Sequence, residues 1–141
     1  MPSSNPPSTS MAPPSPLRDL TAGQFDWDGW EALIAQNGLT IDRPYRSRHP
    51  EFSDIIYPLN YGYLNNTTST DGHEVDVFVG SADNGLVGLL MTTDYSRGDR
   101  EVKLLYNCTP EEIYLANGFI NFDRTRMEGT LVLRHPMHEL W

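Results

Sequence analysis

The stretch from residue 74 to residue 79 constrains the fold most, because its side chains alternate strictly. Valines occupy every second position from Val75 to Val79, while Glu74, Asp76 and Phe78 occupy the positions between them. In an extended strand successive side chains point to opposite faces, so this pattern predicts a strand with one valine face. The same pattern places both carboxylates on the opposite face, away from the valines.

Strand-like segments make up much of the chain on either side of this stretch. Further strands are predicted over residues 39–42, 55–64, 86–93, 101–106 and 129–133. Two short helices are also predicted. The first covers residues 25–36, and the second starts at the capping sequence TPEE from Thr109 and ends near Ala116. Five or six strands with two short flanking helices indicate a mainly β fold, a small barrel that is closed or half closed.

The first sixteen residues differ from the rest in composition. They hold six of the eleven prolines and five serines, and they contain no apolar run. Such a segment cannot bury enough surface to fold, so we expect residues 1–16 to be disordered and residues 17–141 to form a single domain. The segment lacks the apolar core of a secretory signal, and the lone Cys108 suits a reducing compartment. We therefore expect a cytoplasmic protein without a membrane partner.

The chain is strongly acidic, with 19 Asp and Glu against 10 Lys and Arg and a formal net charge of −9. Nucleic-acid-binding proteins usually show a basic face, so nucleic acid is not an expected partner. If an acidic protein binds a phosphate compound, metal ions must bridge the two negative parties. The simpler explanation of the charge is solubility, since surface carboxylates are common.

Two pairs of polar residues are candidates for such a site. Asp71 and Asp76 lie close enough in sequence, around Gly72, for both carboxylates to bind one hard cation such as Mg²⁺. Glu101 and Lys103 fall on the same side of a predicted strand, where a carboxylate and an ammonium suit a metal and a phosphate oxygen. A salt bridge at the end of a hairpin explains this second pair equally well.

Two motifs in residues 57–79 resemble the core of the soluble family I inorganic pyrophosphatases. That family has a Y-P-x-N-Y-G-[FY] segment, followed after a short loop by D-G-D-P-x-D-V. Here the segments read YPLNYGY from Tyr57 and DGHEVDV from Asp71. The next hairpin, from Asp94 to Lys103, is similar to the family's D…D-x-K segment. The clear resemblance covers roughly residues 55–106.

The resemblance implies a fold, an activity and a set of site residues. The family's fold is a small, highly twisted OB-type β-barrel, and its members hydrolyse pyrophosphate to two phosphates with Mg²⁺, for which Mn²⁺ could substitute. By position, the metal ligands would be Asp71, Asp76, Asp94, Glu101 and, in an IDRP segment similar to the family's I-E-x-P strand, Asp42. The substrate-binding residues would be Lys103, Tyr61 and Tyr57, with Arg46 or Arg48 supplying a further phosphate contact. Self-association is common in the family, which makes a homo-oligomer a further expectation.

The catalytic half of the second motif departs from the family. His73 replaces the middle aspartate, which in the family helps to deprotonate the attacking water, and Glu74 replaces the proline. A neutral imidazole can also accept a proton, and Glu74 offers a carboxylate one residue on, so His73, Glu74 and Asp76 are the candidate catalytic residues. The alternative is a barrel that binds metal and a phosphate or phosphoanhydride without turning pyrophosphate over.

Overall fold

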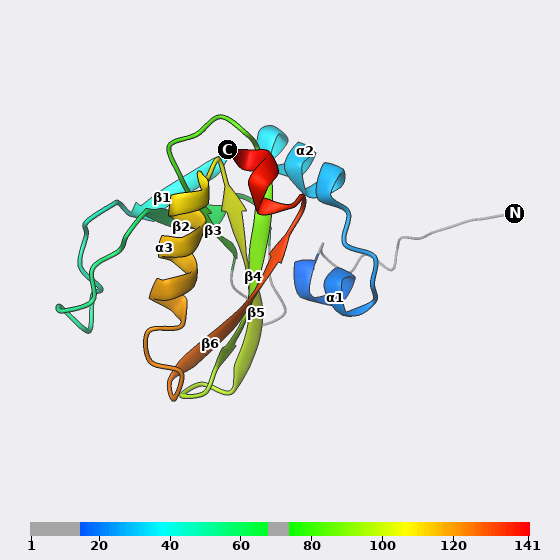
Figure 1. Cartoon of the computed structure of the whole chain (residues 1–141). Coiled ribbons are helices and arrows are strands. Elements are labelled where there is room, and N and C mark those ends of the chain that lie inside the picture. Colours follow the sequence, from blue (N-terminus) through cyan, green and yellow to red (C-terminus); the bar gives the residue numbers. More distant parts are fainter. Residues whose placement is uncertain (1–14, 68–73) are drawn as a thin grey trace, which may run out of the picture.

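A computed structural model describes residues 15–67 and 74–141, which form one six-stranded sheet with helices on both faces (Figure 1). The strands are β1 (Leu39–Arg43), β2 (Asn60–Leu64), β3 (Val75–Val79), β4 (Leu86–Asp94), β5 (Asp99–Tyr106) and β6 (Met127–Leu133). The helices are α1 (Pro16–Thr21), α2 (Trp27–Asn37) and α3 (Pro110–Ile120), followed by a short 3₁₀ helix over Met137–Leu140. The predicted mainly β class is therefore confirmed.

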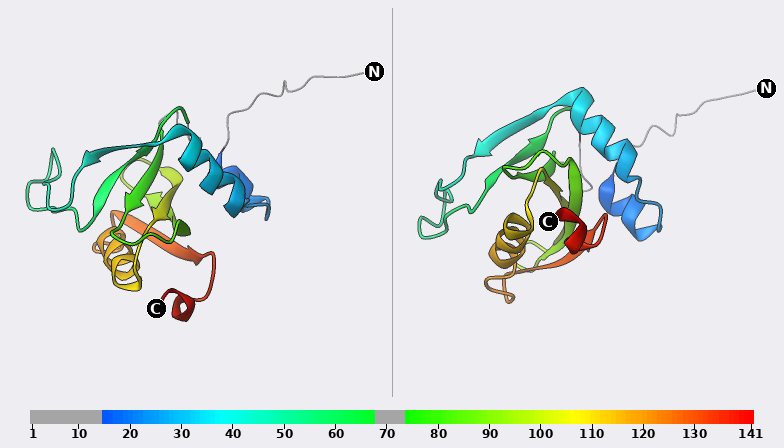
Figure 2. Two further views of the ribbon diagram at one scale, coloured as in Figure 1. Left: turned by 90° about the horizontal axis from the view of Figure 1, so that it is seen from above. Right: turned by 45° about the horizontal axis from the view of Figure 1, so that its top comes forward.

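The strands follow the order β1-β2-β3-β5-β4-β6 across the sheet. Neighbouring strands are antiparallel except for β3 and β5, which are parallel. The sheet twists strongly from β1 to β6 (Figure 2), and these two strands are its edges, so it is barrel-like but not closed. Six strands agree with the predicted five or six.

Alternation along the strands builds two hydrophobic cores, one on each face of the sheet. On one face, Val75 and Val77 of β3 pack in a cluster with Trp30 of α2. On the other face, Phe78 packs in a cluster with Ile113 of α3. Both valines and Phe78 are fully buried, so the predicted alternation of β3 is confirmed. A slip of one residue would move each side chain to the wrong core, which fixes the register of the strand.

Helix α3 begins as predicted and ends later than predicted. The Thr109 hydroxyl accepts a hydrogen bond from the Glu112 amide, and the Glu112 carboxylate accepts one from the Thr109 amide, which completes a capping box. The helix continues through Gly118 to Ile120. Ile120 is 5% exposed, and burial of an isoleucine contributes about 1.5 to 3 kcal/mol, which outweighs the cost of about 1 kcal/mol for a helical glycine.

Two further elements differ between the prediction and the structure. Helix α1 was not predicted, and the Ser15 hydroxyl caps it by accepting a hydrogen bond from the Arg18 amide. Strand β2 begins only at Asn60, because the chain before Pro58 forms part of a loop. Residues 1–14 lie outside the described residues, so their disorder and the domain limits stay predictions. Ser15 and Pro16, which were predicted to be disordered with them, form the cap and the first residue of α1. No helix in the described part of the chain is long and apolar enough to cross a membrane.

Candidate functional site

The α3 face of the sheet changes from apolar to polar along its strands. On β5, Glu101 and Lys103 lie on the same face as buried Leu105, at two-residue steps toward the start of the strand. On β3, Asp76 likewise lies two residues before buried Phe78. The parallel pairing of β3 with β5 sets Asp76 directly beside Lys103. The polar side chains therefore meet at one level of the sheet.

Lys103 is the centre of this polar group. It is 6% exposed, and its Nζ donates to the Tyr61 hydroxyl at 2.7 Å, to Oδ2 of Asp76 at 2.9 Å and to Oε1 of Glu101 at 2.6 Å. An ammonium has three protons, so all of its donors are used. The Tyr61 hydroxyl in turn donates to Oδ2 of Asp76 at 2.6 Å. Two carboxylates thus share one buried cation.

Burial and charge shift the protonation of the group in different directions. Burial disfavours the charge of Lys103, yet Tyr61, Asp76 and Glu101 together hold its pKa well above the ordinary value. Burial also acts to raise the pKa of Asp76, but Lys103 and Tyr61 outweigh it and lower that pKa. Burial raises the pKa of Glu101 to about 7, although Lys103 opposes the shift. Asp76 is therefore the carboxylate that carries its charge more easily.

A cavity of about 420 Å³ opens above this group. Carboxylates and cationic side chains both line it: six acidic residues, Asp42, Glu74, Asp76, Asp94, Asp99 and Glu101, and three basic ones, Arg43, Arg97 and Lys103. Tyr57, Tyr61 and His49 form an aromatic part of its wall. Most of the site residues expected from the sequence are thus gathered in one space.

Arg43 enters the cavity because of a β-bulge. The register of β1 with β2 shifts between Ile41 and Arg43, so that Arg43 lies opposite Tyr61. Its Nε is buried without a hydrogen-bond partner among the described residues, and one terminal nitrogen lies 3.5 Å from Asp42. The sequence did not single out Arg43 for this position, because a bulge of this kind leaves no clear pattern.

Arg46 and Arg48, the arginines expected to contact substrate, are not among the residues that line the cavity. The Arg46 guanidinium lies over the Tyr45 ring, 5.0 Å from its centre, and Arg48 donates to the Ser53 carbonyl at 2.6 Å. Their role in binding stays a prediction. Asp71 and His73 lie outside the described residues.

Tyr57 and Asp94 both line the cavity and also make contacts that support the surrounding structure. Tyr57 is 7% exposed, with its ring 5.3 Å from that of Tyr61 and 5.1 Å from that of Phe119. Oδ1 of Asp94 accepts hydrogen bonds from the amide and hydroxyl of Ser96 and from the Arg97 amide, which holds the β4–β5 turn. Both residues therefore shape the site whatever else they bind.

The donor atoms of the cavity suit a hard divalent cation. Carboxylate oxygens are the ligands that Mg²⁺ prefers, and Asp76 and Glu101 are near neighbours around Lys103. Within residues 15–67 and 74–141, no three Asp, Glu, His or Cys side chains converge closely enough to hold a metal by themselves. Mg²⁺ commonly keeps several waters and substrate oxygens, so one or two carboxylates suffice as protein ligands.

Comparison with known proteins gives remote structural likenesses. The sequence matches no protein-family model and no curated protein. An inorganic phosphatase from Anaplasma phagocytophilum is 18% identical, with a TM-score of 0.40 over 67% of this chain and 81% of that one. An inorganic pyrophosphatase from Thermus thermophilus is 17% identical, with a TM-score of 0.42 over 68% of this chain and 81% of that one.

Proposed function

We propose that the cavity binds pyrophosphate together with divalent metal ions and hydrolyses it to two phosphates. The observation that carries the proposal is the mixed charge of the cavity, six carboxylates and three cationic side chains around one space. The excess of carboxylates repels a bare polyanion, and Lys103, Arg43 and Arg97 repel a bare cation. A metal–phosphate complex has partners for both kinds of side chain, because the metal takes carboxylate oxygens and the phosphate takes the basic groups.

The basic side chains have separate parts in this proposal. Lys103 keeps the Asp76 and Glu101 carboxylates in place, since all of its protons are bound within the site. Arg43 is the better candidate for direct contact with a phosphate oxygen, because its buried Nε has no partner among the described residues. An arginine can donate two parallel hydrogen bonds to a phosphate, which orients the substrate as well as binding it.

Hydrolysis requires a proton acceptor next to the attacking water. The water oxygen bonds to one phosphorus, the bond from that phosphorus to the bridging oxygen breaks, and the bridging oxygen leaves on the second phosphate. Glu74, which lines the cavity, and His73 are the candidate acceptors of the water proton. A divalent metal would make that water more acidic and would neutralise the charge of the leaving phosphate. Asp76 and Glu101 would hold the metal, with Asp94, Asp42 and Asp71 as further ligands.

Phosphate release from pyrophosphate tests the proposal directly. Wild-type protein is assayed with Mg²⁺ and then with Mn²⁺, beside Asp76→Asn and the control Asp83→Asn. Asp83 is exposed and does not line the cavity, so its variant makes the same charge change outside the site. We expect Asp76→Asn to lower kcat/KM by at least about 100-fold and Asp83→Asn to leave it unchanged. Circular dichroism and urea midpoints confirm that both variants are folded.

Two results would overturn the proposal. Wild-type protein that releases no phosphate with either metal is not a pyrophosphatase. If calorimetry with Mg²⁺ then shows pyrophosphate binding, the alternative of a binding barrel without turnover is supported instead. Full activity in folded Asp76→Asn would show that phosphate release takes place elsewhere in the molecule.

A further inference from the structure

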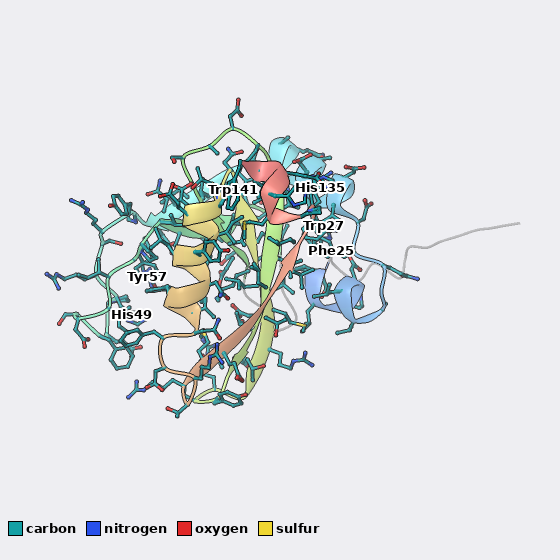
Figure 3. All side chains as sticks on the ribbon, in the orientation of Figure 1. Phe25, Trp27, His49, Tyr57, His135 and Trp141 are labelled. Atoms are coloured by element: carbon teal, nitrogen blue, oxygen red, sulfur yellow. The ribbon has the colours of Figure 1, made fainter. Side chains whose placement is uncertain are left out.

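His49 is a residue of the cavity wall that the sequence did not single out. It lies in the loop between β1 and β2 and lines the same cavity as Asp76 and Lys103. Its ring contacts two aromatic rings, with centroids 6.4 Å from Tyr57 at an interplanar angle of 8° and 5.2 Å from Phe52 at 37°. Figure 3 shows His49 and Tyr57 together on this loop, beside α3. The ring therefore packs against both aromatic neighbours.

Backbone hydrogen bonds determine which ring nitrogen of His49 carries the proton. Nδ1 accepts from the Glu51 amide at 3.1 Å and from the Phe52 amide at 3.3 Å. An amide N–H can only donate, so Nδ1 must present its lone pair. The neutral imidazole then carries its proton on Nε2. The loop thus fixes one tautomer, in which Nε2 is a hydrogen-bond donor.

We propose that Nε2–H of His49 donates a hydrogen bond to a phosphate oxygen of the substrate. This inference rests on the proposed function and adds a substrate-binding residue to it. In a cavity with more acids than bases, an anion needs hydrogen-bond donors. Nδ1 of His49 is already used as an acceptor by the loop, so Nε2 carries the proton and can only donate. Tyr57 joins His49 to the rest of the site, because it stacks on His49 and lies 5.3 Å from Tyr61, whose hydroxyl binds Asp76.

Two substitutions separate the two nitrogens of His49. His49→Asn places an oxygen near the position of Nδ1, where it can accept from the Glu51 and Phe52 amides, but it has no group at the position of Nε2. His49→Gln places its amide nitrogen near the position of Nε2 and has no acceptor at the position of Nδ1. The first variant keeps the support of the loop and loses the proposed donor, while the second does the reverse.

The variants are compared by steady-state hydrolysis of pyrophosphate with Mg²⁺ and by calorimetric binding of inorganic phosphate with Mg²⁺, a probe that cannot be turned over. We expect His49→Asn to raise KM and the Kd for phosphate by about tenfold, the loss of one hydrogen bond to a charged group, with a smaller change in kcat. We expect His49→Gln to keep both constants within about threefold of wild type, although its urea midpoint falls because the loop loses an acceptor.

The outcomes distinguish a failure of this inference from a failure of the proposed function. Unchanged KM and Kd in His49→Asn, with wild-type hydrolysis intact, would overturn the role of Nε2 alone. The reverse order, in which Gln loses affinity and Asn keeps it, would show that only the support of the loop by Nδ1 matters. Wild-type protein that binds phosphate without hydrolysing pyrophosphate would refute the proposed function, and the Kd values would still decide on His49. Wild-type protein that does neither would refute both.

Discussion

Replacing Lys103 by methionine is the perturbation whose effect the geometry defines most closely. Lys103 is 6% exposed, and its three protons go to Tyr61, Asp76 and Glu101. Methionine keeps an unbranched apolar side chain of similar length but removes the charge and the three donors. Asp76 and Glu101 then lie side by side without the cation that they share.

The size of the effect follows from burial. Removing one partner of a buried ion pair costs about 3 to 5 kcal/mol. The cost should lie at the lower end here, because the Asp76 and Glu101 side chains keep 28% and 21% of their surface exposed and can recover hydration. We expect the free energy of unfolding to fall by about 3 kcal/mol, which for a domain of this size lowers Tm by roughly 12 °C.

A double-mutant cycle with Glu101→Gln measures whether the group acts as a unit. In the wild-type background, glutamine keeps an oxygen that accepts from Lys103, so losing the charge should cost about 1 kcal/mol. In the Lys103→Met background, loss of the ammonium raises the pKa of Glu101 further, so at neutral pH its carboxyl is largely uncharged and the same change should cost little. Urea unfolding of the four proteins, in the presence of a chelator so that metal binding does not contribute, should give a coupling energy of about 1 kcal/mol.

Two results would refute this account of the site. If the stability loss of the double variant equals the sum of the losses of the two single variants within about 0.5 kcal/mol, Lys103 and Glu101 act independently. A Lys103→Met protein with the stability of wild type would show that the carboxylates do not depend on the buried ammonium. Either result would remove the physical basis for a preformed carboxylate pair at the floor of the cavity.

Two further predictions concern the fold. Gly62→Ala should destabilise the protein by about 3 kcal/mol, because the added methyl group would collide with the Thr40 carbonyl oxygen of β1. Gly118→Ala should instead stabilise α3 by about 1 kcal/mol, because nothing lies within 4 Å of its added methyl group. Equal urea midpoints for these two variants would contradict the close approach of β1 to β2. Burial raises the pKa of Cys108 to about 12 from an ordinary value of 9.0, so the folded state keeps a proton that the unfolded chain releases, and stability should fall as the pH rises from about 9. Cys108→Ala should remove that part of the pH dependence. A thiol reagent should also label the native protein more slowly than the urea-unfolded protein, and equal rates would contradict the burial of this thiol.

The parts of the fold with strong local patterns could be predicted from the sequence. The valine alternation of β3 determined the face on which Asp76 lies, because a slip of one residue would move Val75 and Val77 out of the core that they share with Trp30. The capping sequence from Thr109 determined the start of α3, because both of its hydrogen bonds are local. Local patterns did not determine the end of α3, which depends on the burial of Ile120 against the sheet.

The loop side of the cavity could not be predicted in the same way. Arg43, Arg46 and Arg48 are equivalent in the sequence, and only the bulge in β1 places Arg43 opposite Tyr61. The polarity of the loop likewise says nothing of His49, whose place depends on backbone hydrogen bonds and on stacking with Tyr57. In both cases the deciding contacts join residues whose spacing has no regular period.

The position of the cavity follows from where α3 ends. Ile120, the last residue of the helix, and Thr92 of β4 both lie against Gly129 of β6. Under the helix a polar side chain would be buried without partners, and beyond it an apolar side chain would be exposed to water. The side chains on this face therefore change from apolar to polar at the level of Ile120. On β4, apolar Leu90 is followed on the same face by Thr92 and then by Asp94. Antiparallel pairing of Thr92 with Glu101 carries the change across to β5 at the same level, so the acidic residues meet because the helix stops covering them.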